Sequence, residues 1–191
     1  MEQMGLNELT IRTISEAKCD VDLAHAKKHL AGMLFEQFAY QYLAAKNKGS
    51  NKLLTNDETV GFYRELYPNN KVIYHSTELE TDGIEGISVP DLLLVNRFGI
   101  IKAVYHCTAR RDIDNSEQLI VASKSDKLRH PSFFSNDCTF NIVTTSNANL
   151  DIWQGDDSSQ IKLPISGREL GEIVNEIWVS ATVGFIIQNP S

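Results

Sequence analysis

Residues 84–111 read IEGISVPDLLLVNRFGIIKAVYHCTARR, and this stretch decides the expected fold. Two apolar runs, at about 86–95 and 100–109, are separated by the turn-forming residues 96–99. Their length and their content of β-branched residues predict two adjacent strands of a hairpin. The first strand contains a Pro-Asp pair, whose carboxylate belongs to Asp91.

The second of these strands carries several residues with chemical potential. Because alternate residues of a strand point to one face, we expect Tyr105 and Cys107 to share a face with Ile101 and Ala103. His106 is expected on the opposite face. Tyr105 and Cys107 come fourteen and sixteen positions after Asp91.

Periodicity and turn residues predict the other elements. Apolar residues spaced by three and four positions predict a long helix that follows a cap at Asp22, and a second helix capped by Asn56 or Asp57. The expected helices are 22–46, 55–66, 114–128 and 167–179. The expected strands are 72–80, 86–95, 100–109, 139–145 and 161–165, with an edge strand at 182–187.

The order of these elements indicates an α/β fold. Three consecutive strands joined by short turns form an antiparallel meander, and a helix followed by a further strand allows a crossover. We therefore expect an α-βββ-α-β core with a mixed central sheet flanked by helices. Residues 1–191 are expected to form a single domain, with an N-terminal arm at 1–21 and a core at about 22–180.

This order and a few short motifs resemble the PD-(D/E)xK nuclease superfamily, which has a restriction-endonuclease-like core. In that family a strand carrying an Asp pairs with a strand carrying Glu-x-Lys, and the first helix often supplies a glutamate. The segment Gly-Met-Leu-Phe-Glu-Gln-Phe at 32–38 is similar to that first helix. The resemblance implies that Asp91 and Glu36 hold Mg²⁺ and that DNA is the substrate. Alternatively, Glu36 is a solvated residue beside an apolar stripe.

The sequence departs from the family where the Glu and the Lys are expected, because these positions hold Tyr105 and Cys107. A neutral phenol is a weak Mg²⁺ ligand, and a thiol prefers softer metals. A rebuilt site would need groups from elsewhere in the chain. The candidates are Lys102, His106, Glu117, Lys124, Glu78 and Glu80. A nucleophile pair of Cys107 with a histidine is a further alternative, although a buried structural thiol is the simpler interpretation.

Four cations after the central strands are candidate nucleic-acid contacts: Arg110, Arg111, Lys124 and Lys127. In nucleases of this family the corresponding region flanks the cleft and contacts phosphates. Acidic residues interrupt the cluster. The alternative is therefore an ordinary solvated helix face with salt pairs.

Composition limits the broad class of the protein. Hydrophobic residues at 42% and charged residues at 23% are typical of a globular protein, and the net charge of -7 argues against a polybasic nucleic-acid coat. Three widely spaced cysteines suggest free thiols in a reducing compartment. With no expected signal peptide or membrane span, we expect a cytoplasmic protein that does not bind membranes. The apolar C-terminal helix favours a homo-oligomer.

Together these observations predict a nuclease-like protein whose active site is eroded. Metal-dependent cleavage of DNA would be ancestral, and any remaining activity would need Mg²⁺ at Asp91 and Glu36. The alternative is a non-catalytic module on the same fold that binds nucleic acid or protein.

Overall fold

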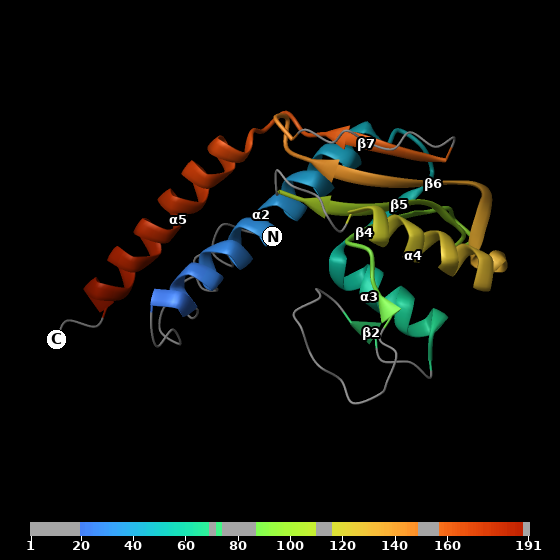
Figure 1. Cartoon of the computed structure of the whole chain (residues 1–191), viewed down its shortest axis with the longest axis horizontal. Helices are drawn as coiled ribbons and strands as arrows, with labels where there is room; N and C mark the ends of the chain where they lie inside the picture. Colours follow the sequence, from blue (N-terminus) through green and yellow to red (C-terminus); the bar gives the residue numbers. More distant parts are fainter. Residues whose placement is uncertain (1–19, 69–71, 74–86, 110–115, 149–156, 189–191) are drawn as a thin grey trace.

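The computed structural model describes residues 20–68, 72–73, 87–109, 116–148 and 157–188. These residues form an α/β structure around a five-stranded mixed sheet with the strand order β1-β4-β5-β6-β7 (Figure 1). The strands are β1 (Lys52–Leu54), β4 (Leu92–Val95), β5 (Ile101–Thr108), β6 (Phe134–Thr144) and β7 (Ser158–Lys162). β1, β4 and β5 are antiparallel, whereas β6 and β7 run parallel to β5.

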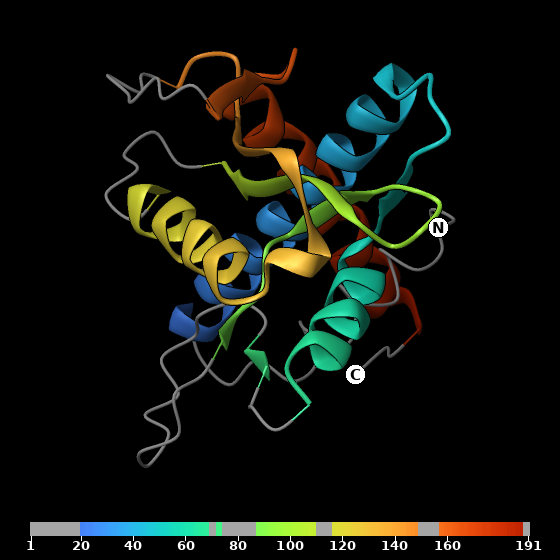
Figure 2. The same ribbon diagram turned by 90° about the vertical axis from the view of Figure 1, so that its right-hand side faces the viewer.

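Helices cover both faces of the sheet. The helices are α2 (Asp20–Lys46), α3 (Asn56–Leu66), α4 (Ser116–Arg129) and α5 (Gly167–Gln188). α2 and α5 pack side by side and share one hydrophobic core with the sheet (Figures 1 and 2). α3 and α4 contribute to a second core on the other face. None of the helices in these ranges is both long and apolar enough to cross a membrane.

The two long helices follow from apolar residues at helical spacing. α2 buries residues on adjacent turns, including Ala26, Leu30 and Leu34, and α5 does the same with residues such as Leu170 and Val174. This confirms the predicted helices at 22–46 and 167–179. α2 already begins at Asp20, so the predicted cap at Asp22 is wrong, and residues 1–19 of the predicted arm lie outside the described residues.

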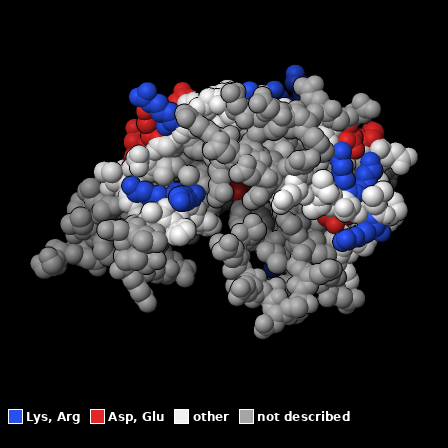
Figure 3. Space-filling view, in the orientation of Figure 1, with Lys and Arg blue, Asp and Glu red and all other residues white. Residues whose placement is uncertain are grey.

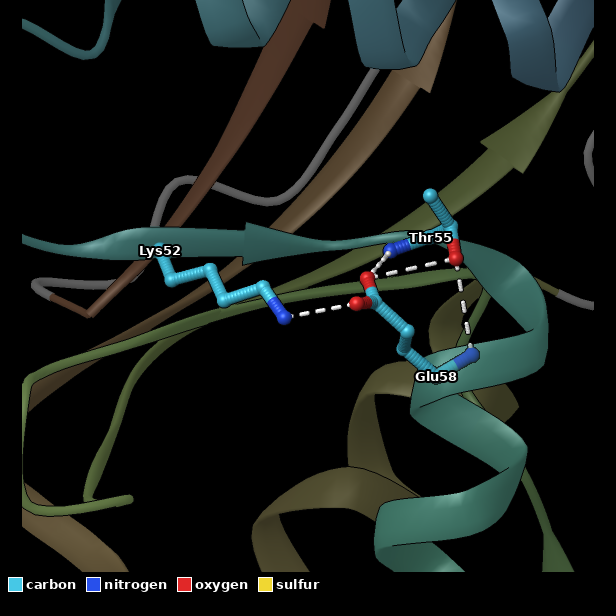
Figure 4. A network of polar contacts seen from close by, with 3 residues as sticks. All are labelled: Lys52, Thr55 and Glu58. Carbon is cyan, nitrogen blue, oxygen red and sulfur yellow. Dashed lines mark hydrogen bonds and ion pairs between the residues drawn. The ribbon is translucent and has the colours of Figure 1, made fainter. Parts of the chain in front are cut away.

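α3 begins with a complete capping box. The Thr55 hydroxyl accepts a hydrogen bond from the Glu58 backbone N–H, and the Glu58 carboxylate accepts one from the Thr55 N–H (Figure 4). Lys52 on β1 forms an ion pair with the same carboxylate at 2.6 Å. The cap is therefore Thr55, and the predicted caps at Asn56 or Asp57 are wrong by one or two positions.

The first strand of the meander differs from the prediction. The three-residue strand β1 lies beside β4. Of the predicted strand at 72–80, only residues 72–73 are among the described residues. Residues 72–73 form β2 (Val72–Ile73), which pairs with β3 (Ile87–Ser88) in a separate two-stranded parallel sheet. The predicted strand at 86–95 is thus divided into β3 and β4. Pro90 lies between them, and proline cannot donate a ladder hydrogen bond.

Two further expectations fail for local reasons. Ile101 was expected to share a face with Ala103 and Tyr105, but it packs in the core with α3 and α4, on the opposite face. The reason is a shift in the pairing register of β5 with β6 between Ile101 and Ala103. The predicted edge strand at 182–187 is instead the last part of α5. The turn at 96–99 and the crossover helix α4 are as predicted, and Gly99 has the positive φ of 76° that this turn requires.

Candidate functional site

Asp91 lies at the start of β4 and is fixed by the neighbouring strand. Its backbone N–H donates to the carbonyl of Tyr105 at 3.1 Å. Its side-chain Oδ2 accepts a hydrogen bond from the backbone N–H of Cys107 at 2.5 Å. The carboxylate is therefore held against β5, the strand on which the family pattern would place its acid and its lysine.

Glu36 reaches the same place from α2. The residue is buried, with 7% of its surface exposed, although its neighbours Phe35 and Ala39 belong to the apolar stripe of the helix. The side-chain amide of Asn56, the first residue of α3, donates to Glu36 Oε2. The interpretation of Glu36 as a solvated surface residue is thus wrong.

The two carboxyl groups are close enough to affect each other. Burial and, to a lesser extent, the charge of Glu36 together raise the pKa of Asp91 from its ordinary 3.8 to about 8, although the hydrogen bond from Cys107 acts in the opposite direction. Buried Glu36 and partly buried Asp91, from separate elements, therefore meet at the N-terminal end of β4. Such a like-charged pair is costly in a folded protein unless a proton or a cation neutralises it.

Tyr105 and Cys107 stand beside this acid pair. Tyr105 is paired with Leu92 of β4, and both belong to the core under α2, as does the half-buried Cys107. Burial, together with the charges of Asp91 and Glu36, raises the pKa of the Cys107 thiol well above its ordinary value. Burial also raises the pKa of Tyr105. Both groups are therefore neutral at pH 7 and supply no charge to the site.

The described groups that were candidates to replace the missing acid and lysine are engaged elsewhere. Lys102 forms an ion pair with Asp137 at 2.7 Å. His106 is buried on the other face, where its Nε2 lies 2.8 Å from Ser123 Oγ of α4. Burial lowers the pKa of His106 to about 4. Glu78 and Glu80 lie outside the described residues, as does the side chain of Glu117.

The predicted nucleic-acid contacts are only partly described. Lys124 forms an ion pair with Asp157 at 2.6 Å, and Lys127 Nζ donates to the carbonyl of Asn136 at 2.9 Å. Figure 3 shows basic and acidic atoms side by side at the end of the molecule that carries α4 and β6. Arg110 and Arg111 lie outside the described residues. The described part of the cluster has the mixed charge of a salt-paired face.

One residue of this site was missed from the sequence. Asn56 follows the cap of α3, and a polar residue there is normally explained by the helix start alone. No spacing rule connects it with Glu36, because the two residues meet only through the packing of α2 against β1 and α3. Within the described ranges, no three His, Cys, Asp or Glu side chains are arranged to hold a metal ion.

Searches of protein-family models, of curated proteins and of solved structures found no match to this chain.

Proposed function

We propose that this protein is a restriction-endonuclease-like domain that keeps half of a nuclease metal site. Glu36 and Asp91 bind a divalent cation, Mg²⁺ or Mn²⁺, whereas phosphodiester cleavage is weak or lost. The observation that carries the proposal is the approach of these two carboxylates, the buried one of Glu36 on α2 and the partly buried one of Asp91 at the start of β4, within reach of each other's charge. Mg²⁺ is commonly bound by one or two carboxylates, with water and substrate phosphates as the other ligands.

The order of the elements supports the same proposal. α2 precedes three antiparallel strands, β1, β4 and β5, and α4 then leads to β6, which is parallel to β5. This is an α-βββ-α-β order, apart from α3 and the small sheet inserted between β1 and β4. The acid pair lies at the strand pair that would carry catalysis in such a core.

The weakness of the expected chemistry follows from Tyr105 and Cys107. Cleavage of a phosphodiester needs hard oxygen ligands for the metal and a positive charge facing the developing oxyanion. A phenol and a thiol provide neither. Since loss of one such stabilising group costs about 10²–10³ in rate, loss of two leaves little activity.

A second candidate function follows from the same two positions. A domain with neutral side chains where the acid and lysine belong would serve as a non-catalytic module that binds nucleic acid or protein. We further propose that DNA is the partner of this module, that the protein forms a homo-oligomer and that it is located in the cytoplasm. The neutral thiol of Cys107 is the observation that favours this alternative.

The two functions separate in one set of assays. Plasmid and single-stranded DNA are incubated with the protein and Mg²⁺ or Mn²⁺, and Asp91→Ala is run beside the wild type. Cleavage that the substitution abolishes supports the enzyme. Retention of DNA without cleavage, weakening at high salt, supports the binding module.

A paired control locates any DNA binding. Lys124→Gln/Lys127→Gln is expected to weaken retention and to flatten its salt dependence. Lys48→Gln, an exposed lysine next to the end of α2, is expected to change retention little. If wild type neither cleaves nor retains DNA, both DNA-based functions fail.

A further inference from the structure

A groove of about 670 Å³ runs between α2, α5 and the segment that joins β7 to α5. Its apolar wall includes Phe38 and Tyr42 of α2, Leu163 after β7, and Ile173 of α5. Phe38 and Ile173 are only partly covered, although both pack against the core shared by the two helices. A groove of this size falls within the usual range for ligand pockets, about 300–1,000 Å³.

The α5 side of the groove is acidic. Glu169, Glu172 and Glu176 line it. Their spacing of three and four positions places them on one side of the helix. Glu169 accepts a hydrogen bond from the Ser166 N–H at 2.7 Å and Glu172 pairs with Arg168 at 2.9 Å, so both have local partners. Like charges four residues apart, as at 172 and 176, destabilise a helix by about 0.2–0.5 kcal/mol.

We propose that this groove binds a peptide segment of a partner protein that presents a large apolar side chain next to Lys or Arg. The apolar wall would take up the hydrophobic side chain, and the acidic ridge of α5 would attract the cation. The same ridge repels phosphates, so nucleic acid is not the occupant. This binding site is separate from Glu36 and Asp91, and its test does not depend on the metal site.

The charge requirement is tested with a fluorescent peptide of Leu and Lys, about twelve residues or roughly three helical turns long. Its counterpart carries Glu in place of every Lys. Fluorescence anisotropy is expected to show binding of the Leu/Lys peptide, weaker at high salt, and binding about tenfold weaker or undetectable for the Leu/Glu peptide. Equal affinity for the two peptides would overturn the proposal.

Matched variants locate the binding site. Glu172→Gln/Glu176→Gln is expected to weaken binding of the Leu/Lys peptide several-fold, whereas Asp57→Asn/Glu65→Gln, which removes the same charge from exposed positions on α3, is not. Ile173→Ala is also expected to weaken it, whereas Val179→Ala, at a residue of α5 that is 60% exposed, is not. Circular dichroism confirms that each variant is folded. If the groove variants behave like their controls, the proposal is wrong.

Sedimentation velocity of the free protein tests the competing occupant. The proposal requires the groove to be accessible in the wild type at the concentrations used for anisotropy. A dimer that Glu172→Gln/Glu176→Gln or Ile173→Ala dissociates would assign the groove to a second copy of the chain and would overturn the proposal. An unchanged sedimentation coefficient in all variants supports a peptide partner.

Discussion

At Asp91, burial and the charge of Glu36 act on the carboxyl group in the same direction. The ordinary pKa of 3.8 applies to the unfolded chain, and the folded value is about 8. Between these values the folded protein binds a proton that the unfolded chain has released. The free energy of unfolding therefore falls as the pH rises from about 4 to about 8.

The contribution of His106 to the free energy of unfolding has the opposite pH dependence. The pKa of this residue is lowered from 6.5 to about 4 by burial, so the unfolded chain binds the extra proton within that interval. Its contribution to stability is lost as the pH falls through this range and is constant above it. The interval from about 6.5 to 8 therefore separates the effect of Asp91 from that of His106.

Asp91→Asn should remove most of the pH dependence in that interval. The amide oxygen can still accept the hydrogen bond from Cys107, while the repulsion from Glu36 disappears. We expect the variant to be more stable than wild type at pH 8 by about 1–3 kcal/mol, the usual range for a desolvated polar group. Urea unfolding at about pH 6.5, about 7.2 and about 8.0 measures the difference in the free energy of unfolding between the variant and the wild type. Asp57→Asn, at an exposed position, serves as the control. If the free energy of unfolding depends on pH in the same way in the wild type and in Asp91→Asn, the pKa of Asp91 is not raised and the prediction is wrong.

Between elements, α3 and α4 are joined by a buried polar cluster. Asp126 of α4 accepts hydrogen bonds from Tyr67 at 2.6 Å and from Tyr63 at 3.4 Å. Burial raises the pKa of Asp126, and the two tyrosines oppose that shift. The cluster ties both helices to one face of the sheet.

Tyr67→Phe is expected to destabilise the protein by about 1.5–3 kcal/mol, because a hydrogen bond to a charged group is lost. Tyr40→Phe on α2 is a matched control, since no hydrogen bond of the Tyr40 hydroxyl is found within the described ranges, and it should cost much less. Denaturant unfolding measures both variants. A double-mutant cycle with Asp126→Asn should give a coupling energy well above zero, and additive effects would contradict this account.

The elements differ in how well the sequence predicts them. α2 and α5 are long enough for their apolar spacing to be recognised, and the hairpin around 96–99 has a clear turn signal. β1 is only three residues long and has no period of its own, so its pairing with β4 could not be foreseen. The shift at Ile101 is a local bulge, which alternation along a strand cannot reveal.

For the whole molecule, the α/β class with helices around a mixed sheet was predictable, but the acid pair was predictable only in part. Asp91 and Glu36 were predicted as a pair only because the family that the sequence resembles places acids at these points of a similar order. The contribution of Asn56 depends on how α2 packs against the start of α3, and a single sequence does not specify that packing. The groove beside α5 likewise depends on the approach of two helices that are far apart in the chain.

Rebuilding the family motif tests the proposed ancestry of the whole domain. Tyr105→Glu/Cys107→Lys would place an acid and a lysine on the face of β5 that meets Asp91 and Glu36. We expect Mg²⁺-dependent DNA cleavage to rise above wild type, with about 10²–10³ in rate for each restored group as the upper range. Tyr105→Gln/Cys107→Met is the uncharged control.

The folded state of the rebuilt variant is checked by circular dichroism and thermal unfolding. A variant that is folded and binds Mn²⁺ without cleaving DNA would contradict the proposed ancestry. If this variant does not fold, Cys107→Lys alone provides the second test, since it adds the cation beside two existing acids. Cleavage at the level of the uncharged control would again count against the proposal.

Calorimetric titration with Mn²⁺ at about pH 8, close to the pKa of Asp91, tests the central claim that Glu36 and Asp91 together bind a divalent cation. We expect a single binding event in the wild type that is lost in both Glu36→Gln and Asp91→Asn and kept in Asp57→Asn. A wild type that binds no Mn²⁺, or variants that bind it as well as the wild type does, would contradict the claim.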